Sequence, residues 1–227
     1  MTSYTLTSAF PRDHFSASYL SGLLREPASR LSGLARLRTF YRPYICPMGW
    51  ILSEIPKDAR LYDIGCGSGV LLYLAKAVSQ VNLAHGYDID PGAVTTSQIF
   101  SYDQNSFRVE CLPVESTPPN LSGYDVVTMI DVLHHIPSDQ QRKFMQRVAD
   151  NMAPGARLVF KDIDASEFAG SCMNQLHDLI LARQWVHPLS RQESVRMLTE
   201  AGLSVLRHDT RWSLWYPHHL IVAEKPA

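Results

Sequence analysis

Apolar runs of strand length alternate with longer segments of helical period along most of the chain. Five runs have the length and the apolar content of strands, at residues 60–64, 83–87, 107–112, 124–130 and 157–163. The clearest helical periods lie between them, at residues 70–78, 92–100 and 139–151. Because strands that alternate with helices form parallel sheets covered by those helices, the pattern predicts an α/β fold.

The last third of the chain departs from this alternation. A long insertion of helical character follows the fifth strand at residues 167–184, and a further helix at 191–201 has Ser190 as N-cap and Gly202 just past its end. Two more strand-like runs, 203–208 and 219–223, are joined by DTRWSLWYPH, which predicts an antiparallel pair.

The first 58 residues read as helices punctuated by five prolines. We expect residues 1–58 to form a helical cap or lid. Residues 59–227 should form the main domain, with a substrate-covering insertion at about 165–189.

Composition limits the class of partner and of site. The 227 residues carry a formal net charge of -1, so the chain lacks the overall basic field that non-specific nucleic-acid binding needs. The four cysteines have no CxxC spacing, which indicates neither disulfides nor a structural zinc site. No apolar run approaches the roughly 18 residues of a membrane span. We therefore expect a cytoplasmic protein with no metal site and no nucleic-acid partner.

The stretch LYDIGCGSGV places three glycines between the first strand and a helix that starts near Val70. Gly65, Gly67 and Gly69 let the backbone turn sharply and approach a ligand, and the free N–H groups there favour anionic ligand groups. A dinucleotide-binding turn would have its third glycine at position 70, which argues against NAD. No Walker lysine follows, so ATP is not indicated.

A second signal lies at the end of the next strand, in HGYDIDPGAV. Asp88 follows Asp63 by 25 positions, about where a carboxylate in such a unit accepts hydrogen bonds from ribose hydroxyls.

With these motifs in order, the sequence resembles the class I S-adenosylmethionine-dependent methyltransferases. DIGCGSG is similar to their first motif, GYDID to their second strand, YDVVTMIDVLHHIP to the fourth strand and its loop, and MAPGARLVFKD to the turn into the fifth strand. The resemblance covers roughly residues 59–164. It implies a Rossmann-like, mostly parallel seven-stranded sheet with an antiparallel C-terminal hairpin, which binds S-adenosylmethionine and releases S-adenosylhomocysteine.

The resemblance also implies roles for individual residues. The three glycines would cradle the methionine portion and the ribose, Asp63 would orient their loop and approach the ammonium group, and Asp88 would hold the ribose hydroxyls. Ile89 would pack on the adenine, and Asp131 would line the methionine end. Relatives often place an acid after the third strand for the adenine amino group. The segment here reads ECLPVESTPP, so backbone carbonyls near Leu112 are the expected substitute.

Histidines are the candidates for acceptor chemistry. Methyl transfer needs a base only when the acceptor must lose a proton, as a phenol of pKa near 10 would. His134 and His135 follow the fourth strand, where an α/β sheet opens toward its ligand. His187 lies just beyond the insertion. We name His134 and His187 as candidate bases or substrate contacts. Shaping a loop is the competing interpretation of each.

The loop after the fourth strand lacks the Asn-Pro-Pro-Tyr motif of amino-methylating enzymes and the paired glutamates of arginine methylators. This favours a small-molecule acceptor. The wording after the fifth strand resembles methyltransferases of aryl-polyene and fatty-acid-type pathways, which suggests a phenolic or an acyl, polyketide-type metabolite.

Two alternatives stay open. Residues 1–58 carry an excess of three positive charges, which suits an acidic partner such as an acyl carrier protein that presents a tethered substrate. The other is a regulatory protein that binds S-adenosylmethionine without transferring the methyl group.

Overall fold

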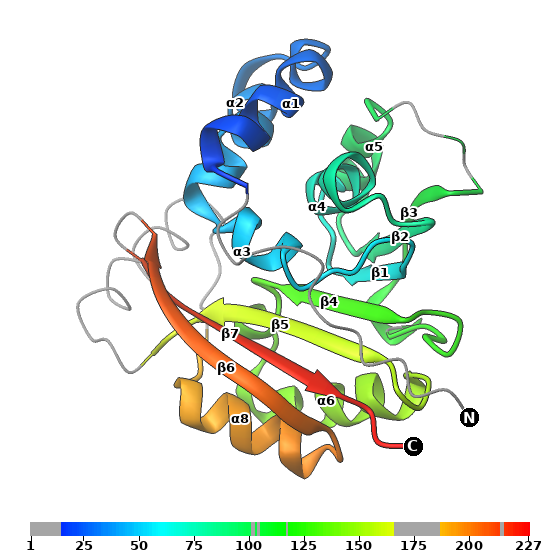
Figure 1. Cartoon of the computed structure of the whole chain (residues 1–227), viewed down its shortest axis with the longest axis vertical. Helices are drawn as coiled ribbons and strands as arrows, with labels where there is room; N and C mark the ends of the chain where they lie inside the picture. Colours follow the sequence, from blue (N-terminus) through cyan, green and yellow to red (C-terminus); the bar gives the residue numbers. More distant parts are fainter. Residues whose placement is uncertain (1–14, 101–102, 104, 117, 166–186, 214–215) are drawn as a thin grey trace. The chain divides into compact units, whose positions relative to one another are not determined.

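The computed structural model describes residues 15–100, 103, 105–116, 118–165, 187–213 and 216–227 (Figure 1). It confirms the seven-stranded sheet, with the strand order β3-β2-β1-β4-β5-β7-β6. Strands β2 with β3 and β4 with β5 pair in parallel, whereas β7 pairs antiparallel with both β5 and β6. The strands are β1 Arg60–Ile64, β2 Leu83–Asp88, β3 Phe107–Cys111, β4 Val126–Ile130, β5 Arg157–Ile163, β6 Ser204–Ser213 and β7 Tyr216–Glu224.

The C-terminal hairpin is longer than the sequence predicted. Strands β6 and β7 take up most of the stretch DTRWSLWYPH, which we had expected to be a connection, and Ser213 pairs with Tyr216. Side chains along β6 alternate between exposed and half-buried. The strand therefore has no fully apolar face. Its sequence lacks the alternation of apolar and polar residues that predicts a strand, so a loop was expected there.

The chain forms two compact units, which we describe separately. The first contains Met1–Leu61 and Cys66–Cys111, and the second contains Tyr62–Gly65 and Leu112–Ala227.

The first unit holds strands β2 and β3 and most of the short helices. Its helices are α1 Ala17–Ser29, α2 Gly33–Ile45, α3 Met48–Leu52, α4 Val70–Leu74, a π-helical turn at Ala75–Ser79 and α5 Pro91–Ser97. The predicted prolines do punctuate the N-terminal helices, because Pro27 and Pro43 lie in the last turns of α1 and α2. Helix α1 is tied to α2 where the Ser21 hydroxyl donates to the Phe40 carbonyl at 2.9 Å.

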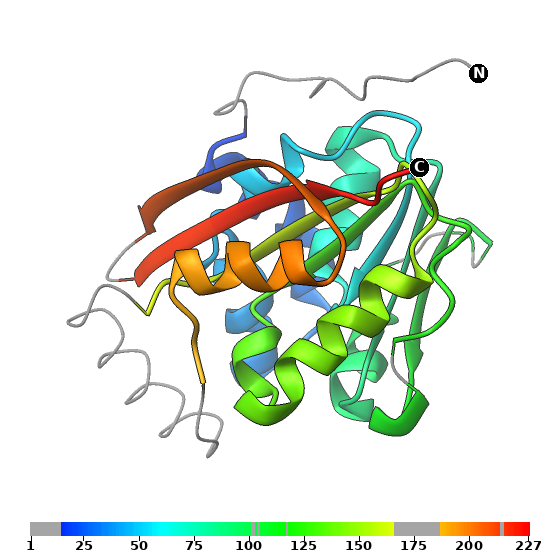
Figure 2. The same cartoon turned by 90° about the horizontal axis from the view of Figure 1, so that it is seen from below.

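The second unit places helices on the β4–β5–β7–β6 part of the sheet. Helices α6 Ser138–Asn151 and α8 Arg191–Glu200 lie side by side against these strands (Figures 1 and 2), and Arg142 of α6 pairs with Glu200 of α8. Strand β5 is buried along its whole length. The unit is therefore a sheet whose central strand is out of contact with water.

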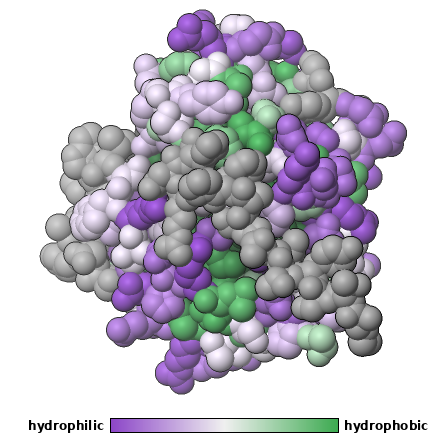
Figure 3. Space-filling view, viewed as in Figure 1, coloured by the Kyte–Doolittle hydropathy of each residue, from purple (hydrophilic) through white to green (hydrophobic). Residues whose placement is uncertain are grey.

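Hydrophilic residues dominate the described surface on the face shown in Figure 3, with smaller groups of hydrophobic residues between them. None of the helices in the described part of the chain is long and apolar enough to cross a bilayer. The predicted insertion at 167–184 lies outside the described residues.

Candidate functional site

The glycine turn after β1 has the bare backbone that the sequence suggested. Gly65, Gly67 and Gly69 adopt φ values of 66°, 54° and 76°, in the left-handed region. A Cβ at Gly65 would lie 2.5 Å from Val132, and one at Gly69 would lie 3.1 Å from Val109. A Cβ at Gly67 would meet nothing within 4 Å. Packing thus requires two of the glycines, while Gly67 borders open space.

Asp88 at the end of β2 is bonded to this turn. Its Oδ2 accepts from the Gly67 N–H at 2.7 Å, and its Oδ1 accepts from the Asp90 N–H at 2.9 Å. A carboxylate oxygen has two lone pairs, so each oxygen of Asp88 keeps acceptor capacity for another donor. The next residue, Ile89, leaves 57% of its surface exposed.

These features of the first unit fit an adenosine group. Gly67 leaves room beside the turn, Asp88 can still accept from vicinal hydroxyls, and Ile89 offers an apolar surface to a base. The adenine contact near Leu112 stays a prediction.

Asp63, in the second unit, is buried. Its Oδ1 accepts from the Thr128 hydroxyl of β4 at 2.6 Å, so this carboxylate is fixed by a neighbouring strand. The predicted approach of Asp63 to an ammonium group stays a prediction.

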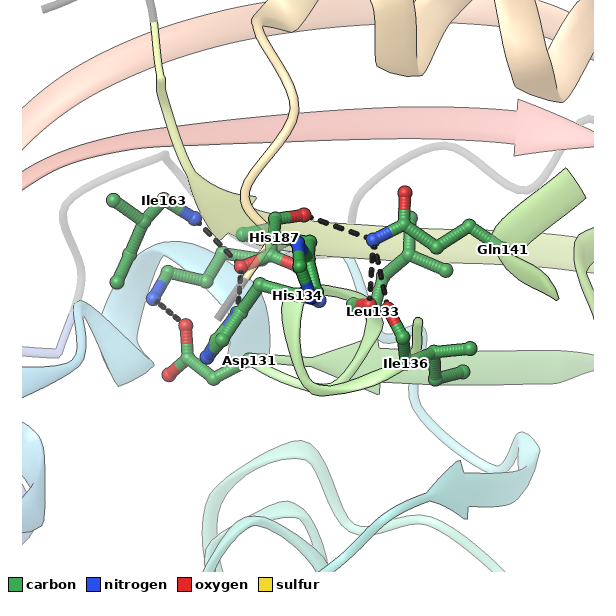
Figure 4. Close-up of polar contacts among 9 residues, drawn as sticks. Asp131, Leu133, His134, Ile136, Gln141, Ile163 and His187 are labelled. Atoms are coloured by element: carbon green, nitrogen blue, oxygen red, sulfur yellow. Dashed lines mark hydrogen bonds and ion pairs between the residues drawn. The ribbon is translucent and has the colours of Figure 1, made fainter. Parts of the chain in front are cut away.

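Asp131 directly follows β4 and is held by one residue of β5. It has a φ of 57°, which is uncommon for a residue with a side chain. Its N–H donates to the Lys161 carbonyl at 3.0 Å, and its Oδ1 pairs with the Lys161 ammonium (Figure 4). Lys161 is fully buried, so its charge is balanced by Asp131.

His134 is paired with the next residue of β5. Its Nδ1 bonds to Asp162 Oδ1, and its backbone N–H donates to Asp162 Oδ2 at 3.3 Å (Figure 4). Burial opposes ionisation of Asp162, but the charge and hydrogen bond of His134 outweigh burial, and the pKa of Asp162 lies below its usual value. Asp162 is therefore an ionised acceptor that orients the His134 ring.

His187 is brought to the same loop by its main chain. Its N–H donates to the His134 carbonyl at 2.7 Å, and its own carbonyl accepts from Gln141 Nε2 at 2.8 Å. The Gln141 amide also donates to the carbonyls of Leu133 and Ile136, each at 3.1 Å (Figure 4). Buried Gln141 thus joins α6, the loop after β4 and the segment at His187, whose side chain is exposed.

Three of these residues were missed by the sequence interpretation. Lys161 and Asp162 were visible as two charges inside the apolar run LVFKDI, which is the signal that could have found them. Gln141 gave no signal, because a glutamine on an amphipathic helix usually faces solvent. Among the described residues, no three His, Cys, Asp or Glu side chains gather as a metal site.

Comparison with known proteins decides the family. The model of a family described as "Methyltransferase domain" matches residues 35–208, well over half of the chain. The chain belongs to this family of class I S-adenosylmethionine-dependent methyltransferases. S-adenosylmethionine is the cofactor of this class, and the adenosine-compatible turn agrees with it.

Curated relatives match only part of their own length. The chain is 29% identical over 120 residues to the ribosomal protein L11 methyltransferase of Bordetella parapertussis, an alignment that covers 53% of this chain and 36% of the relative. It is 27% identical over 164 residues to the indolepyruvate C-methyltransferase of Streptomyces griseus, covering 67% and 48%. The match therefore spans less than half of either relative.

A solved structure shares the fold. The chain aligns with a putative methyltransferase solved in complex with the Haloferax volcanii Trm112 methyltransferase activator, with a TM-score of 0.72 over 90% of this chain and 98% of that one. The sequences are 13% identical, so this likeness concerns the fold alone.

Proposed function

We propose that the chain transfers a methyl group from S-adenosylmethionine to a small-molecule acceptor by direct in-line displacement. The observation that carries this proposal is the bond between Asp88 and the Gly67 N–H, beside the open space at Gly67. This arrangement gives a ribose-binding carboxylate a fixed position next to a turn that can approach a ligand.

We assign the residues of each unit to parts of the cofactor separately. In the first unit we assign Gly67 and Gly69 to the methionine portion and the ribose, Asp88 to the ribose hydroxyls and Ile89 to the adenine. In the second unit we assign Asp63, Gly65 and Asp131 to the methionine portion. The cofactor supplies a methyl group already activated on a sulfonium. The chain therefore has to align the reacting atoms and exclude water.

His134 is our candidate for the base when the acceptor is a phenol. When His134 is neutral, Asp162 can accept from its Nδ1–H, and the lone pair is then on Nε2. Nε2 would take the phenolic proton as the oxygen attacks, and Asp162 would stabilise the imidazolium that forms. His187 is the second candidate, since its backbone is bonded to that of His134.

We propose an aromatic, phenolic or acyl, polyketide-type metabolite as the acceptor. One matched relative is named for a C-methylation of indolepyruvate, which supports a small aromatic acid, and another is named for ribosomal protein L11. There are two alternatives. The substrate is tethered to an acyl carrier protein, or the protein binds the cofactor without transferring the methyl group.

We also propose that residues 1–58 act as a cap or lid of the domain that spans residues 59–227. Two side-chain hydrogen bonds join these residues to the rest of the first unit. The Tyr73 hydroxyl donates to the Leu23 carbonyl at 3.3 Å, and the Arg30 guanidinium donates to the Ile99 carbonyl at 2.9 Å.

The function can be tested in two steps. Calorimetry should detect binding of S-adenosylmethionine and S-adenosylhomocysteine but not of NAD. Methyl-labelled S-adenosylmethionine is then incubated with free phenols, free acyl acids and the same acids on a carrier protein. Label on a free phenol or a free acid supports our proposal, and label only on the carrier-bound form supports the tethered alternative. Binding of NAD without binding of S-adenosylmethionine overturns both.

A further inference from the structure

Helix α2 turns an apolar row outward. Five of its residues are exposed over 36–68% of their surface: Leu34, Leu37, Tyr41, Tyr44 and Ile45. With 3.6 residues per turn, these positions fall within about a third of the helix circumference. The inward side is marked by buried Thr39 and Pro43. Amphipathic helices of globular proteins usually bury their apolar side, whereas α2 exposes its apolar side to water.

The charges on α2 are all positive. The helix carries Arg36, Arg38 and Arg42 and has no acidic residue. Arg36 and Arg38 are exposed, and neither forms an ion pair with the residues that the structure describes. A surface that covers this row would therefore have to be apolar along the helix and anionic beside it.

Three kinds of surface could be considered, and they differ in what α2 offers them. A second copy of the chain would bring arginines against arginines, which disfavours self-association. A stable protein interface takes about 20–30 residues a side with complementary shape, far more than this single row. A bilayer needs no shape complementarity, and interfacial helices combine an apolar face with flanking cations.

We propose that α2 docks the protein on anionic membrane surfaces, with Leu34, Leu37 and Tyr41 entering the headgroup boundary and Arg38, which flanks the row, facing the lipid phosphates. Tyrosine suits this depth because its ring is apolar and its hydroxyl stays hydrated. The attachment is peripheral and reversible, since it uses one short helix. This inference does not depend on the proposed methyl transfer.

The test is co-sedimentation of the full chain with vesicles of phosphatidylcholine alone or mixed with phosphatidylglycerol. We expect binding to the mixed vesicles, weakened by added salt, and little binding to phosphatidylcholine. Arg38→Gln should lower the partition coefficient by about fivefold, because an arginine near an anionic surface contributes roughly that factor. Leu37→Glu should abolish binding.

Leu206→Glu is the matched control, because Leu206 on β6 is 54% exposed and Leu37 is 53% exposed. It adds the same charge at an equally exposed leucine outside α2, and it should bind vesicles as the unaltered protein does. Circular dichroism should show every variant folded.

Three outcomes overturn the proposal. The unaltered protein does not bind mixed vesicles, or Leu37→Glu and Leu206→Glu weaken vesicle binding equally. The third is that the protein binds an acidic carrier protein without vesicles and that Leu37→Glu alone abolishes this binding. Calorimetry with S-adenosylmethionine on the same variants keeps this test apart from the proposed function, because cofactor affinity should not change.

Discussion

Lys161 holds Asp131 at both ends, through its carbonyl oxygen to the Asp131 N–H and through its ammonium to the Asp131 carboxylate. The lysine is fully buried on β5, and Asp131 is 18% exposed at its side chain. A side chain assigned to the methionine end of the cofactor is therefore positioned from inside the sheet.

Lys161→Met should destabilise the fold and weaken cofactor binding. Removing one partner of a buried ion pair costs about 3–5 kcal/mol, and partial exposure of Asp131 puts the loss near the lower figure. Urea unfolding measures the first effect and calorimetry the second. Adding Asp131→Asn to Lys161→Met should recover part of the stability, since no unpaired carboxylate is left. If the two losses simply add, the pair is not coupled.

Asp88→Asn should weaken S-adenosylmethionine binding by about 1–3 kcal/mol, because the ribose hydroxyls lose a charged acceptor. Calorimetry gives the affinity. Asp90→Asn is the control: Asp90 lies two residues away and caps α5 by accepting from the Gly92 N–H, and asparagine caps helices equally well. Equal affinities of the two variants would remove Asp88 from the binding site.

His134→Gln should lower kcat on a phenolic acceptor by about 10²–10⁴-fold if His134 is the base. The loss should nearly disappear with a phenol acidic enough to be ionised at neutral pH, because that acceptor has no proton to give. Cofactor affinity, measured by calorimetry, should stay unchanged. A variant that is equally slow with both phenols has lost positioning and not a base.

The free energy of unfolding should depend on pH through the buried side chain of His219. Burial lowers its pKa, with Lys161 and Arg191 acting in the same direction and Asp162 and Asp164 opposing. Neither ring nitrogen has a hydrogen-bond partner among the described residues, and the ring lies 5.7 Å from that of Phe160.

Because the folded state holds His219 neutral, the unfolded state takes up a proton first as the pH falls below the ordinary value of 6.5. Stability should therefore be full above that pH and decline below it, and His219→Phe should reduce this decline. Urea unfolding between pH 5 and 8, an interval centred near the ordinary histidine pKa, measures it. His208→Gln, at an exposed position of β6, should leave the decline as it is.

The sequence predicted the sheet, its antiparallel end and the glycine turn, because periodicity and glycine spacing are local signals. Strand β5 was predicted from residue 157 to residue 163 and is observed at those bounds. The partners of Lys161 and Asp162 could not be predicted, because they lie on the loop after another strand. A helix was also expected at residues 70–78. It is observed as α4, Val70–Leu74, followed by a π-helical turn at Ala75–Ser79, and Gln80 after it is in the left-handed region.

Helix α2 shows the same limit of local signals. The sequence predicted helices within residues 1–58, but that prediction does not say which side of a helix the rest of the chain will cover. The exposed row at Leu34, Leu37 and Tyr41 became visible only when burial of Thr39 and Pro43 fixed the inward side.

Lys161 and Asp162 are adjacent on β5, and successive residues of a strand point to opposite sides of the sheet. Ile130 pairs with Lys161 in the observed register. If β5 shifted by one residue against β4, the place of Lys161 beside Asp131 would go to Asp162, and two carboxylates would meet where an ammonium and a carboxylate meet now. The apolar residues of β5 could tolerate such a shift far better than these charges, since the strand is buried on both sides. The two ion pairs therefore favour the observed alignment of β5 with β4 over an alignment shifted by one residue.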